Sequence, residues 1–317
     1  MAAAARRAAT RIDDFICKTP LVQAPLFSSK TGADVYLKLE NLQHTGSFKM
    51  RGATNRLMTL SAAQRGDGCV TASSGNHGAA VACAMQKLEV QGVIFVPERT
   101  SPVKIEAIRS FDGDVRFFGS DGLETEQHAR EFAERNNMVY LSPYNDAEVI
   151  AGQATCGIEI VEQLPDVDAV FIAIGGGGLA SGVGSVLRTH NPNIQIYGCQ
   201  PQASAIMAHS IEAGRIVDLP SEPTLSDGTA GGIEADAITF EFCRELIDEF
   251  ILVSEEEIAN AMRLFINAHE QVIEGAAGVA IAAMLARAEY IADKKVAVII
   301  CGGNVSQETL ESIRIKS

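Results

Sequence analysis

The sequence is short of basic residues and of long hydrophobic runs. Its 317 residues include 26 Lys and Arg against 40 Asp and Glu, which gives a formal net charge of −14. This balance argues against nucleic acid or an anionic membrane surface as the main partner, because binding to phosphate groups needs a basic surface. The longest apolar runs, Asp168–Ile174 and Val296–Cys301, are far shorter than the roughly 20 residues of a membrane-spanning helix. We therefore expect neither a nucleic-acid partner nor a membrane protein.

The seven cysteines form no C-x-x-C pair, and several lie in apolar runs. Cysteine in such runs usually behaves as a small hydrophobic residue rather than as a disulfide partner. The segment Met1–Thr10 is rich in Ala and Arg and has no apolar core of a secretory signal, so we expect a disordered tail there. Both observations predict a reducing, cytoplasmic location.

Apolar runs typical of strands alternate with helical patterns along nearly the whole chain. The predicted strands are Val35–Glu40, Cys69–Ala72, Gly92–Val96, Val115–Phe118, Ala169–Ile174, Ile194–Gln200, Phe250–Val253 and Val296–Cys301. The predicted helices are His77–Leu88, Lys104–Ser110, Glu124–Arg135, Ala147–Gln163, Leu179–Thr189 and one that begins at a capping box of Ser254 and Glu257. Strands that are apolar on both faces and separated by helices form parallel sheets covered on both sides.

The predicted fold class is therefore α/β, with two open, twisted, mostly parallel sheets and helices on both faces. We predict a large domain formed by residues 1–62 and 145–317. A smaller domain, residues 63–144, is inserted within it.

Four consecutive glycines, Gly175–Gly178, lie between a buried predicted strand and a predicted helix. Glycines let the backbone approach a ligand, and the start of a helix adds positive dipole character, so this turn suits one phosphate group. The spacing matches neither G-x-G-x-x-G nor G-x-x-x-x-G-K-[ST], which makes a dinucleotide or a nucleoside triphosphate a poorer fit. We predict a small phosphate-bearing cofactor, and a flexible turn is the alternative.

Lys49 ends the segment Thr45–Lys49 and opens a predicted helix after the strand Val35–Glu40. A cation is disfavoured at a helix N-terminus, and this position lowers the pKa of the amine, as burial also does. A neutral amine is the form that Schiff-base chemistry needs. The alternative is a solvent-exposed lysine in a loop.

Two more turns follow predicted strands. Ser73–Gly78 offers two hydroxyls, an amide and backbone donors, a combination that suits a carboxylate or a ring oxygen. The alternative there is a helix cap by Ser74 or Asn76, with His77 as a structural residue. Cys301–Asn304 follows the last strand. In an open α/β sheet the ligand site lies at the carboxyl ends of the strands, where all four turns are expected.

Taken together, four motifs occur in an order and spacing typical of one family. They are SFKMRGA at Ser47–Ala53, SSGNHG at Ser73–Gly78, GGGG at Gly175–Gly178 and CGGN at Cys301–Asn304. The chain resembles the fold-type II pyridoxal-phosphate enzymes of the threonine/serine dehydratase and serine racemase family, over roughly residues 11–305. The resemblance implies a tryptophan synthase beta-like fold and pyridoxal 5′-phosphate as the cofactor.

The resemblance also assigns roles to residues. Lys49 forms the Schiff base with the cofactor, and Cys301 stands against the pyridine nitrogen, where a weakly acidic thiol leaves the ring neutral and favours prompt β-elimination. The implied cofactor-binding residues are Phe48, Lys49, Asn76, Gly175, Gly176, Gly177, Gly178, Leu179, Glu274 and Cys301. The implied substrate-binding residues are Ser73, Ser74, Asn76 and His77, and the implied catalytic residues are Lys49 and Ser74.

Two departures from the family pattern matter. Where related serine racemases hold a divalent cation with a Glu and an Asp, this chain reads Gln200–Ile206 without either carboxylate, so we predict no metal site. The lysine that such enzymes use near ATP is His44 here, which argues against ATP regulation.

The sequence thus predicts an ammonia-lyase (dehydratase) that converts L-threonine or L-serine into a 2-oxo acid and ammonia. The alternative within the family is a serine racemase, with Ser74 as the acid on the face opposite Lys49. An alternative of another class is a non-enzymatic binder of a phosphorylated metabolite. The resemblance further implies a homodimer. We expect the substrate side chain to lie between Ser120–Gln127 and Ser142–Asn145.

Overall fold

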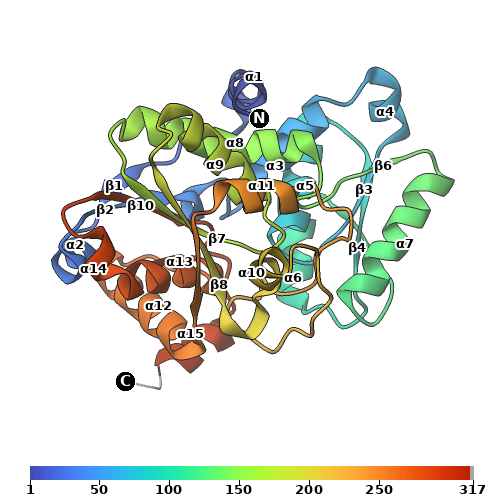
Figure 1. The fold of residues 1–317 in the computed structure, drawn as a ribbon. Coiled ribbons are helices and arrows are strands. Elements are labelled where there is room, and N and C mark those ends of the chain that lie inside the picture. The colour runs from blue at the N-terminus through green and yellow to red at the C-terminus, as the bar shows by residue number, and fades with distance from the viewer. Residues whose placement is uncertain (315–317) are drawn as a thin grey trace.

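The computed structural model describes residues 1–314, so the last three residues of the predicted large domain, 315–317, lie outside the described part. It contains two sheets, shown side by side in Figure 1. In spatial order, the larger sheet comprises β1 (Leu21–Gln23), β2 (Asp34–Leu39), β10 (Lys295–Ile300), β7 (Ala169–Ala173), β8 (Gln195–Pro201) and β9 (Glu249–Val253). The smaller comprises β5 (Asp114–Phe117), β4 (Gly92–Val96), β3 (Cys69–Ala72) and β6 (Val139–Tyr140).

All neighbouring strands run parallel except β1, which pairs antiparallel with β2. The predicted α/β class with two mostly parallel sheets is confirmed. All strands of the smaller sheet come from residues 69–140, whereas the domain limits at residues 62/63 and 144/145 stay a prediction. The edge strands β1 and β6 were not predicted, because segments of three and two residues are too short to show a periodic pattern.

Helices cover both faces of each sheet (Figure 1). They are α1 (Ala2–Ile12), α2 (Pro25–Thr31), α3 (Lys49–Met58), α4 (Ala62–Asp67), α5 (Asn76–Leu88), α6 (Pro102–Arg109), α7 (Gly122–Arg135), α8 (Ala147–Gln163), α9 (Gly178–His190), α10 (Ile206–Glu212), α11 (Thr239–Leu246), α12 (Glu255–His269), α13 (Gly275–Ala286), α14 (Ala288–Ile291) and α15 (Gln307–Arg314). Short 3₁₀ turns are η1 (Asp13–Phe15), η2 (Glu40–Leu42) and η3 (Gln202–Ser204).

The helices of the larger sheet form two layers. On one face α13 packs against β7, β8, β9 and β10, with α12 over it, and on the other face α9 packs against β7 and is covered by α8. On the smaller sheet, α7 packs against β3, β4 and β6, whereas α5 packs against β3 and β4. The capping box at the start of α12 is confirmed, since Ser254 and Glu257 exchange hydrogen bonds.

The expected disordered tail at Met1–Thr10 is wrong, because these residues form most of α1. Alanine has the highest helix propensity, and the buried Ala5, Ala8 and Ile12 recur at intervals of three and four residues along one stripe. This stripe packs against α8, α3 and α9, so tertiary packing stabilises a helix that would be marginal alone. Among residues 1–314, no helix is both long and apolar enough to cross a membrane.

Candidate functional site

Three neighbouring strands bring the predicted site segments to one edge of the larger sheet. The strands β2, β10 and β7 are adjacent and parallel, with Ile300 beside Leu39 and Val298 beside Phe171. Their carboxyl ends therefore lie together, and the chain continues from them into the segment that ends at Lys49, into Cys301, and into the glycine loop, Gly175–Gly178.

Lys49 is the first residue of α3 and is half-buried. Its Nζ donates a hydrogen bond of 2.8 Å to the carbonyl oxygen of Pro143 and lies 5.1 Å from the centroid of the Phe48 ring. Burial lowers the pKa of this amine to about 8, although the charges of Glu274 and Cys301 oppose the shift. The sequence predicts a lowered pKa from the helix start and from burial, and burial is the largest cause in the structure. A substantial fraction of the amine is neutral near physiological pH.

The segment before Lys49 is fastened to the end of β10. The Phe48 N–H donates to the carbonyl of Cys301 at 3.0 Å, and the Gly303 N–H donates to the carbonyl of Gly46 at 2.9 Å. The Asn304 amide adds a bond of 2.8 Å to the carbonyl of Thr45. These contacts hold Lys49 and Cys301 in a fixed relation to each other.

The glycine loop leads into α9 and presents unpaired backbone donors. Gly177, at φ +85°, adopts the left-handed conformation that glycine tolerates best. Within residues 1–314 the N–H groups of Gly176, Gly177, Gly178 and Leu179 have no hydrogen-bond acceptor. Unpaired N–H groups at the start of a helix form an anion site.

Close packing also explains why four glycines stand in a row. A Cβ on Gly176 would lie 2.4 Å from the Tyr144 ring, and one on Gly177 would lie 2.8 Å from the Cys243 sulfur. A Cβ on Gly175 would lie 3.0 Å from the Cα atom of Thr229. The loop is therefore pressed between neighbouring segments, which a flexible turn would not require.

Glu274 is a buried carboxylate at the centre of a hydrogen-bond network. It is the residue before α13, it is 5% exposed, and it accepts hydrogen bonds from Asn76 Nδ2 at 2.8 Å and from the Cys301 thiol at 3.7 Å. Burial raises its pKa to about 7, with a further increase from Asp227. Asn304 completes the network by donating to Asn76 Oδ1 at 2.7 Å.

The network engages both ends of the Asn76 side chain. Its predicted contacts with the cofactor and with the substrate carboxylate thus remain predictions. The thiol of Cys301 is 2% exposed, and burial raises its pKa well above the usual range, so the sulfur keeps its proton.

The turn before α5 offers backbone donors and one free hydroxyl. Ser73 Oγ accepts the N–H of Gly75 at 3.3 Å, whereas the half-buried Ser74 hydroxyl has no partner in the part of the chain that is described. The His77 imidazole has its own partner, with Nε2 3.1 Å from the carbonyl oxygen of Leu141. Burial lowers its pKa to about 3, so the ring is neutral and only the His77 backbone N–H is left for a carboxylate.

One of the two segments expected around the substrate side chain lies at the site. In Ser142–Asn145, Pro143 contacts Lys49 and Tyr144 covers the glycine loop. In Ser120–Gln127, Asp121 caps α7 at the N–H of Glu124, and both side chains are exposed. Glu126 is half-buried and pairs with Arg130, which also pairs with Glu234, and the backbone N–H of Glu234 donates to the Tyr144 hydroxyl. The expectation that this segment faces the substrate side chain stays a prediction.

Sequence reasoning placed Pro143 and Tyr144 only within a segment beside the substrate side chain and gave Asn304 no role of its own. Pro143 acts through its carbonyl, which leaves no signal in a sequence, and Tyr144 through its contact with Gly176. For Asn304 a signal existed, because it ends the motif CGGN that supplied Cys301.

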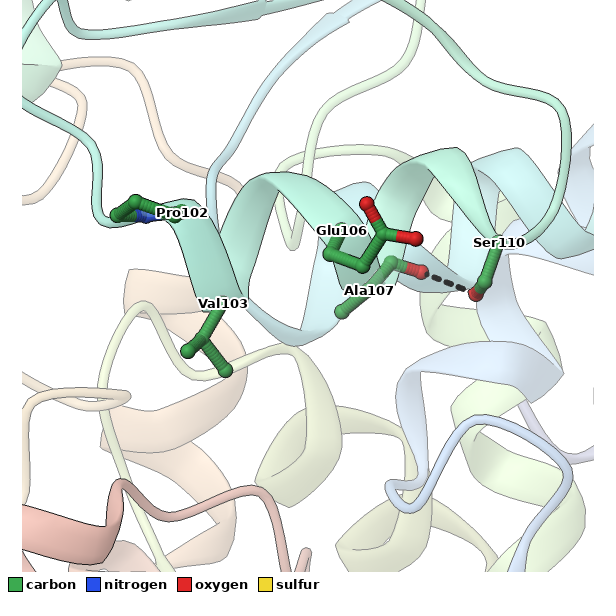
Figure 2. A pocket seen from close by; sticks show the side chains of 5 residues that line it. All are labelled: Pro102, Val103, Glu106, Ala107 and Ser110. Atoms are coloured by element: carbon green, nitrogen blue, oxygen red, sulfur yellow. Dashed lines mark hydrogen bonds between the residues drawn. The ribbon is translucent and has the colours of Figure 1, made fainter.

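Among the hollows on the surface of residues 1–314, two are candidates for the site. One, of about 400 Å³, adjoins the site, because Glu274, Gly275 and Asn304 line it together with Lys104 and Asp227. The other, of about 570 Å³, runs along α6 and is lined by Pro102, Val103, Glu106, Ala107 and Ser110 (Figure 2). Figure 2 shows a single ionisable side chain there, Glu106, so this hollow offers no catalytic group pair. Within residues 1–314, no group of three His, Cys, Asp or Glu could hold a metal ion.

Known proteins resemble this chain over nearly its whole length. The family model "Pyridoxal-phosphate dependent enzyme" matches residues 12–302. An L-threonine ammonia-lyase of Thermotoga maritima is 38% identical over 97% of this chain and 76% of its own length. The processed threonine deaminase isoform 2 of Solanum lycopersicum superposes with a TM-score of 0.93 at 35% identity, covering 99% of this chain and 93% of that one. Maize serine racemase superposes with a TM-score of 0.92 at 30% identity, covering 99% of this chain and 97% of that one. The chain therefore belongs to the family of pyridoxal-phosphate-dependent enzymes.

Proposed function

We propose that the protein is an ammonia-lyase that acts on L-threonine and L-serine. The reaction removes the α-proton and the β-hydroxyl group together as water. Water then replaces the amino group by a carbonyl oxygen, so that a 2-oxo acid and ammonia leave. The relatives named as threonine ammonia-lyase and threonine deaminase, at 38% and 35% identity, support this substrate class.

The side chains and N–H groups at the sheet edge fit pyridoxal phosphate. The unpaired N–H groups from Gly176 to Leu179 suit its phosphate, the Lys49 amine suits its aldehyde, and the Cys301 thiol suits the pyridine nitrogen. When bound, the cofactor withdraws electrons from the bonds around the substrate α-carbon. The buried thiol keeps its proton and donates it to Glu274 in the structure, so Cys301 would have to turn this proton from Glu274 to the pyridine nitrogen, and it could not balance a positive ring charge as a carboxylate would.

The observation that carries the proposal is the place of the Lys49 amine, which follows Phe48 at the start of α3 and donates a hydrogen bond of 2.8 Å to the carbonyl oxygen of Pro143. With a pKa of about 8, the amine is neutral often enough to accept the α-proton and acidic enough, once protonated, to return a proton to the leaving hydroxyl. Its hydrogen bond to Pro143 holds Nζ at one place, and a fixed position converts proton transfer into a step at close range.

The substrate carboxylate is held at the start of α5. The backbone N–H groups of Asn76 and His77 have no acceptor within residues 1–314, and the hydroxyls of Ser73 and Ser74 lie in the same turn. In this position the helix dipole stabilises a negative charge. The imidazole of His77 takes no part, since it is bonded to Leu141.

The test is to supply threonine or serine with pyridoxal phosphate and to measure 2-oxobutanoate or pyruvate. We expect product from the natural protein and a loss of at least roughly 1,000-fold in Lys49→Ala, as for removal of a catalytic base and nucleophile. Lys295→Ala is the matched control, because Lys295 pairs with Asp166 at the opposite end of β10. No product from the natural protein would overturn the proposal.

Serine racemisation is the second candidate, and the unpaired hydroxyl of Ser74 favours it. A racemase needs an acid on the face of the substrate opposite Lys49, and similarity to maize serine racemase at 30% identity supports the same reading. We expect Ser74→Ala to abolish D-serine formation, measured by chiral chromatography, while pyruvate formation persists. D-serine formed at an unchanged rate by Ser74→Ala would exclude this role.

We also propose that the protein is a homodimer and is located in the cytoplasm. Cysteine usage supports the location: all seven cysteines are free and six of them are buried, as expected of a protein from a reducing compartment. Size-exclusion chromatography with light scattering tests the dimer, and a clean monomer at micromolar concentration would contradict it.

A further inference from the structure

Four fully or almost fully buried charges lie next to the segment that leads to Lys49. This buried charge cluster comprises Lys38, Glu40, Arg51 and Glu159, each at most 7% exposed. Two cations face two carboxylates, so the cluster is electrically balanced. Burying four charges is costly, and well-packed apolar residues in their place are often at least as stable. The cluster therefore calls for an explanation other than stability.

Arg51 is the centre of the cluster, and all of its donors are used. Its Nε and Nη2 donate to the two oxygens of Glu40, both at 2.7 Å, in a bidentate pair. Nη1 and Nη2 donate to the two oxygens of Glu159, at 2.6 and 2.9 Å. Lys38 donates to Glu159 at 2.6 Å and to the carbonyl of Thr19 at 2.7 Å. The planar guanidinium fixes the direction of each contact, which a lysine could not do.

The partners of Arg51 lie at special places in the chain. Glu40 is the first residue after β2, where the segment towards Lys49 begins, and Arg51 lies two residues after Lys49, in the first turn of α3. The Glu40–Arg51 pair thus joins the two ends of the segment 41–50. Glu159 connects the same guanidinium to α8, against which α3 packs.

We propose that the Glu40–Arg51 pair is a positioning device for the Lys49 amine. By closing the segment 41–50 at both ends, it sets where α3 begins and thereby where Nζ of Lys49 lies relative to Pro143. Arg51 does not touch the reacting atoms and acts only through Lys49. The relevance of this position to catalysis rests on the proposed function.

Other contacts limit what the pair must do. The middle of the segment is held by the end of β10, through Phe48 and Gly46. Along α3, a Cβ on Gly52 would lie 2.4 Å from Gln153 on α8, so the two helices are in close contact. These anchors fix the segment's centre, the residue before Lys49 and the helix body. The ion pair adds a link that ties the first turn of α3, which contains Lys49, back to the end of β2.

The test compares two double variants, each of which removes one positive and one negative charge from the buried charge cluster. Glu40→Gln with Arg51→Met removes the pair that joins the segment's ends and leaves Lys38 with Glu159. Lys38→Met with Glu159→Gln is the matched control, because it leaves the Glu40–Arg51 pair intact. Each removes one cation and one anion, so both stay balanced.

The measured quantity is the pKa of the Lys49 amine. Competitive acylation of the lysines as a function of pH, with the Lys49 peptide quantified by mass spectrometry, gives the pKa of Lys49 without any cofactor. The charged or titratable groups that face Lys49 are Glu274, Cys301 and His77, and both variants retain all three.

In the Glu40→Gln/Arg51→Met variant we expect the pKa of Lys49 to rise from about 8 towards the ordinary 10.5. Labelling near neutral pH should then fall by roughly tenfold or more, since the neutral fraction falls with each unit. In the control we expect a change below roughly twofold. Equal effects in both variants, or none in the first, would overturn the proposal.

If the first variant fails to fold, as judged by circular dichroism, Arg51→Lys replaces it. The amine keeps the charge but cannot make both bidentate contacts, so the pKa of Lys49 should still rise, and an unchanged value overturns the proposal. Failure of the proposed function is seen separately, as an absence of visible absorbance when the natural protein is mixed with pyridoxal phosphate.

Discussion

Glu274 offers the sharpest test of the electrostatics of the site. It is 5% exposed, and burial raises the pKa of its carboxyl from 4.5 to about 7. The folded protein therefore binds this proton more tightly than the unfolded chain does. Its contribution to stability is fully present below about pH 4.5 and is lost as the pH rises through about 7. Glu274→Gln keeps the shape and the acceptor for Asn76 but removes the ionisation.

The size of the effect follows from the two pKa values. A shift from 4.5 to about 7 corresponds to about 3 kcal/mol between the fully protonated and fully ionised states. Between about pH 5.5 and about pH 8, the linkage relation gives about 2 kcal/mol of this difference. The rest is lost below about pH 5.5, where the carboxyl of the unfolded chain ionises. The free energy of unfolding of the natural protein should therefore fall by about 2 kcal/mol more than that of Glu274→Gln over this pH interval.

The assay is urea denaturation of the cofactor-free protein at both pH values, followed by circular dichroism. The difference between the two proteins cancels every other titrating group. Glu256→Gln, at an exposed position in the first turn of α12, is the control and should behave like the natural protein. If Glu274→Gln shows the same pH dependence as the natural protein, the carboxyl ionises normally, and our account of the Glu274 network fails.

Three further predictions concern the glycine loop, the Lys49 amine and the substrate. Gly176→Ala should destabilise the protein by about 1–3 kcal/mol and weaken binding of pyridoxal phosphate, because a Cβ there meets the Tyr144 ring at 2.4 Å. Gly66→Ala, with nothing within 4 Å, is the control, and equal thermal and titration curves for both variants would refute the packing argument. The rate at which pyridoxal phosphate reacts with the cofactor-free protein should rise with pH and level off above about 8, as the Lys49 amine loses its proton, and a flat profile would exclude Lys49 as the reacting amine. Carboxylates outnumber cations around the hollow beside Glu274, so kcat/KM for 3-hydroxyaspartate should be roughly tenfold or more below that for threonine, and a preference for the dicarboxylate would reveal an unrecognised cation.

Much of the fold could be predicted from the sequence, because its strands are buried on both faces. Such strands appear as apolar runs, and Cys69–Ala72 and Gly92–Val96 were predicted with the bounds that the structure has. The bounds of α8, Ala147–Gln163, were also predicted as the structure has them, because a long helix with a continuous apolar side shows a clear periodic pattern. The start of the chain could not be judged in this way, since α1 is stabilised by packing against α3, α8 and α9, which are distant in the sequence.

The candidate site could be predicted only as a set of turns. Parallel strands place their carboxyl ends at one edge, so Lys49, the glycine loop and Cys301 were expected together. The sequence could not show that the His77 ring turns towards Leu141, nor that Pro143 offers its carbonyl to Lys49. Both depend on distances across the fold and on backbone atoms, which carry no residue-specific signal.

The central claim is that Lys49 is the amine that reacts with the cofactor. The most direct measurement mixes the protein with pyridoxal phosphate, reduces the product with borohydride and locates the added mass by peptide mass spectrometry. The account predicts one modified residue, Lys49, with visible absorbance before reduction that is absent in Lys49→Ala. Modification of a different lysine, or the same absorbance in Lys49→Ala, would contradict it.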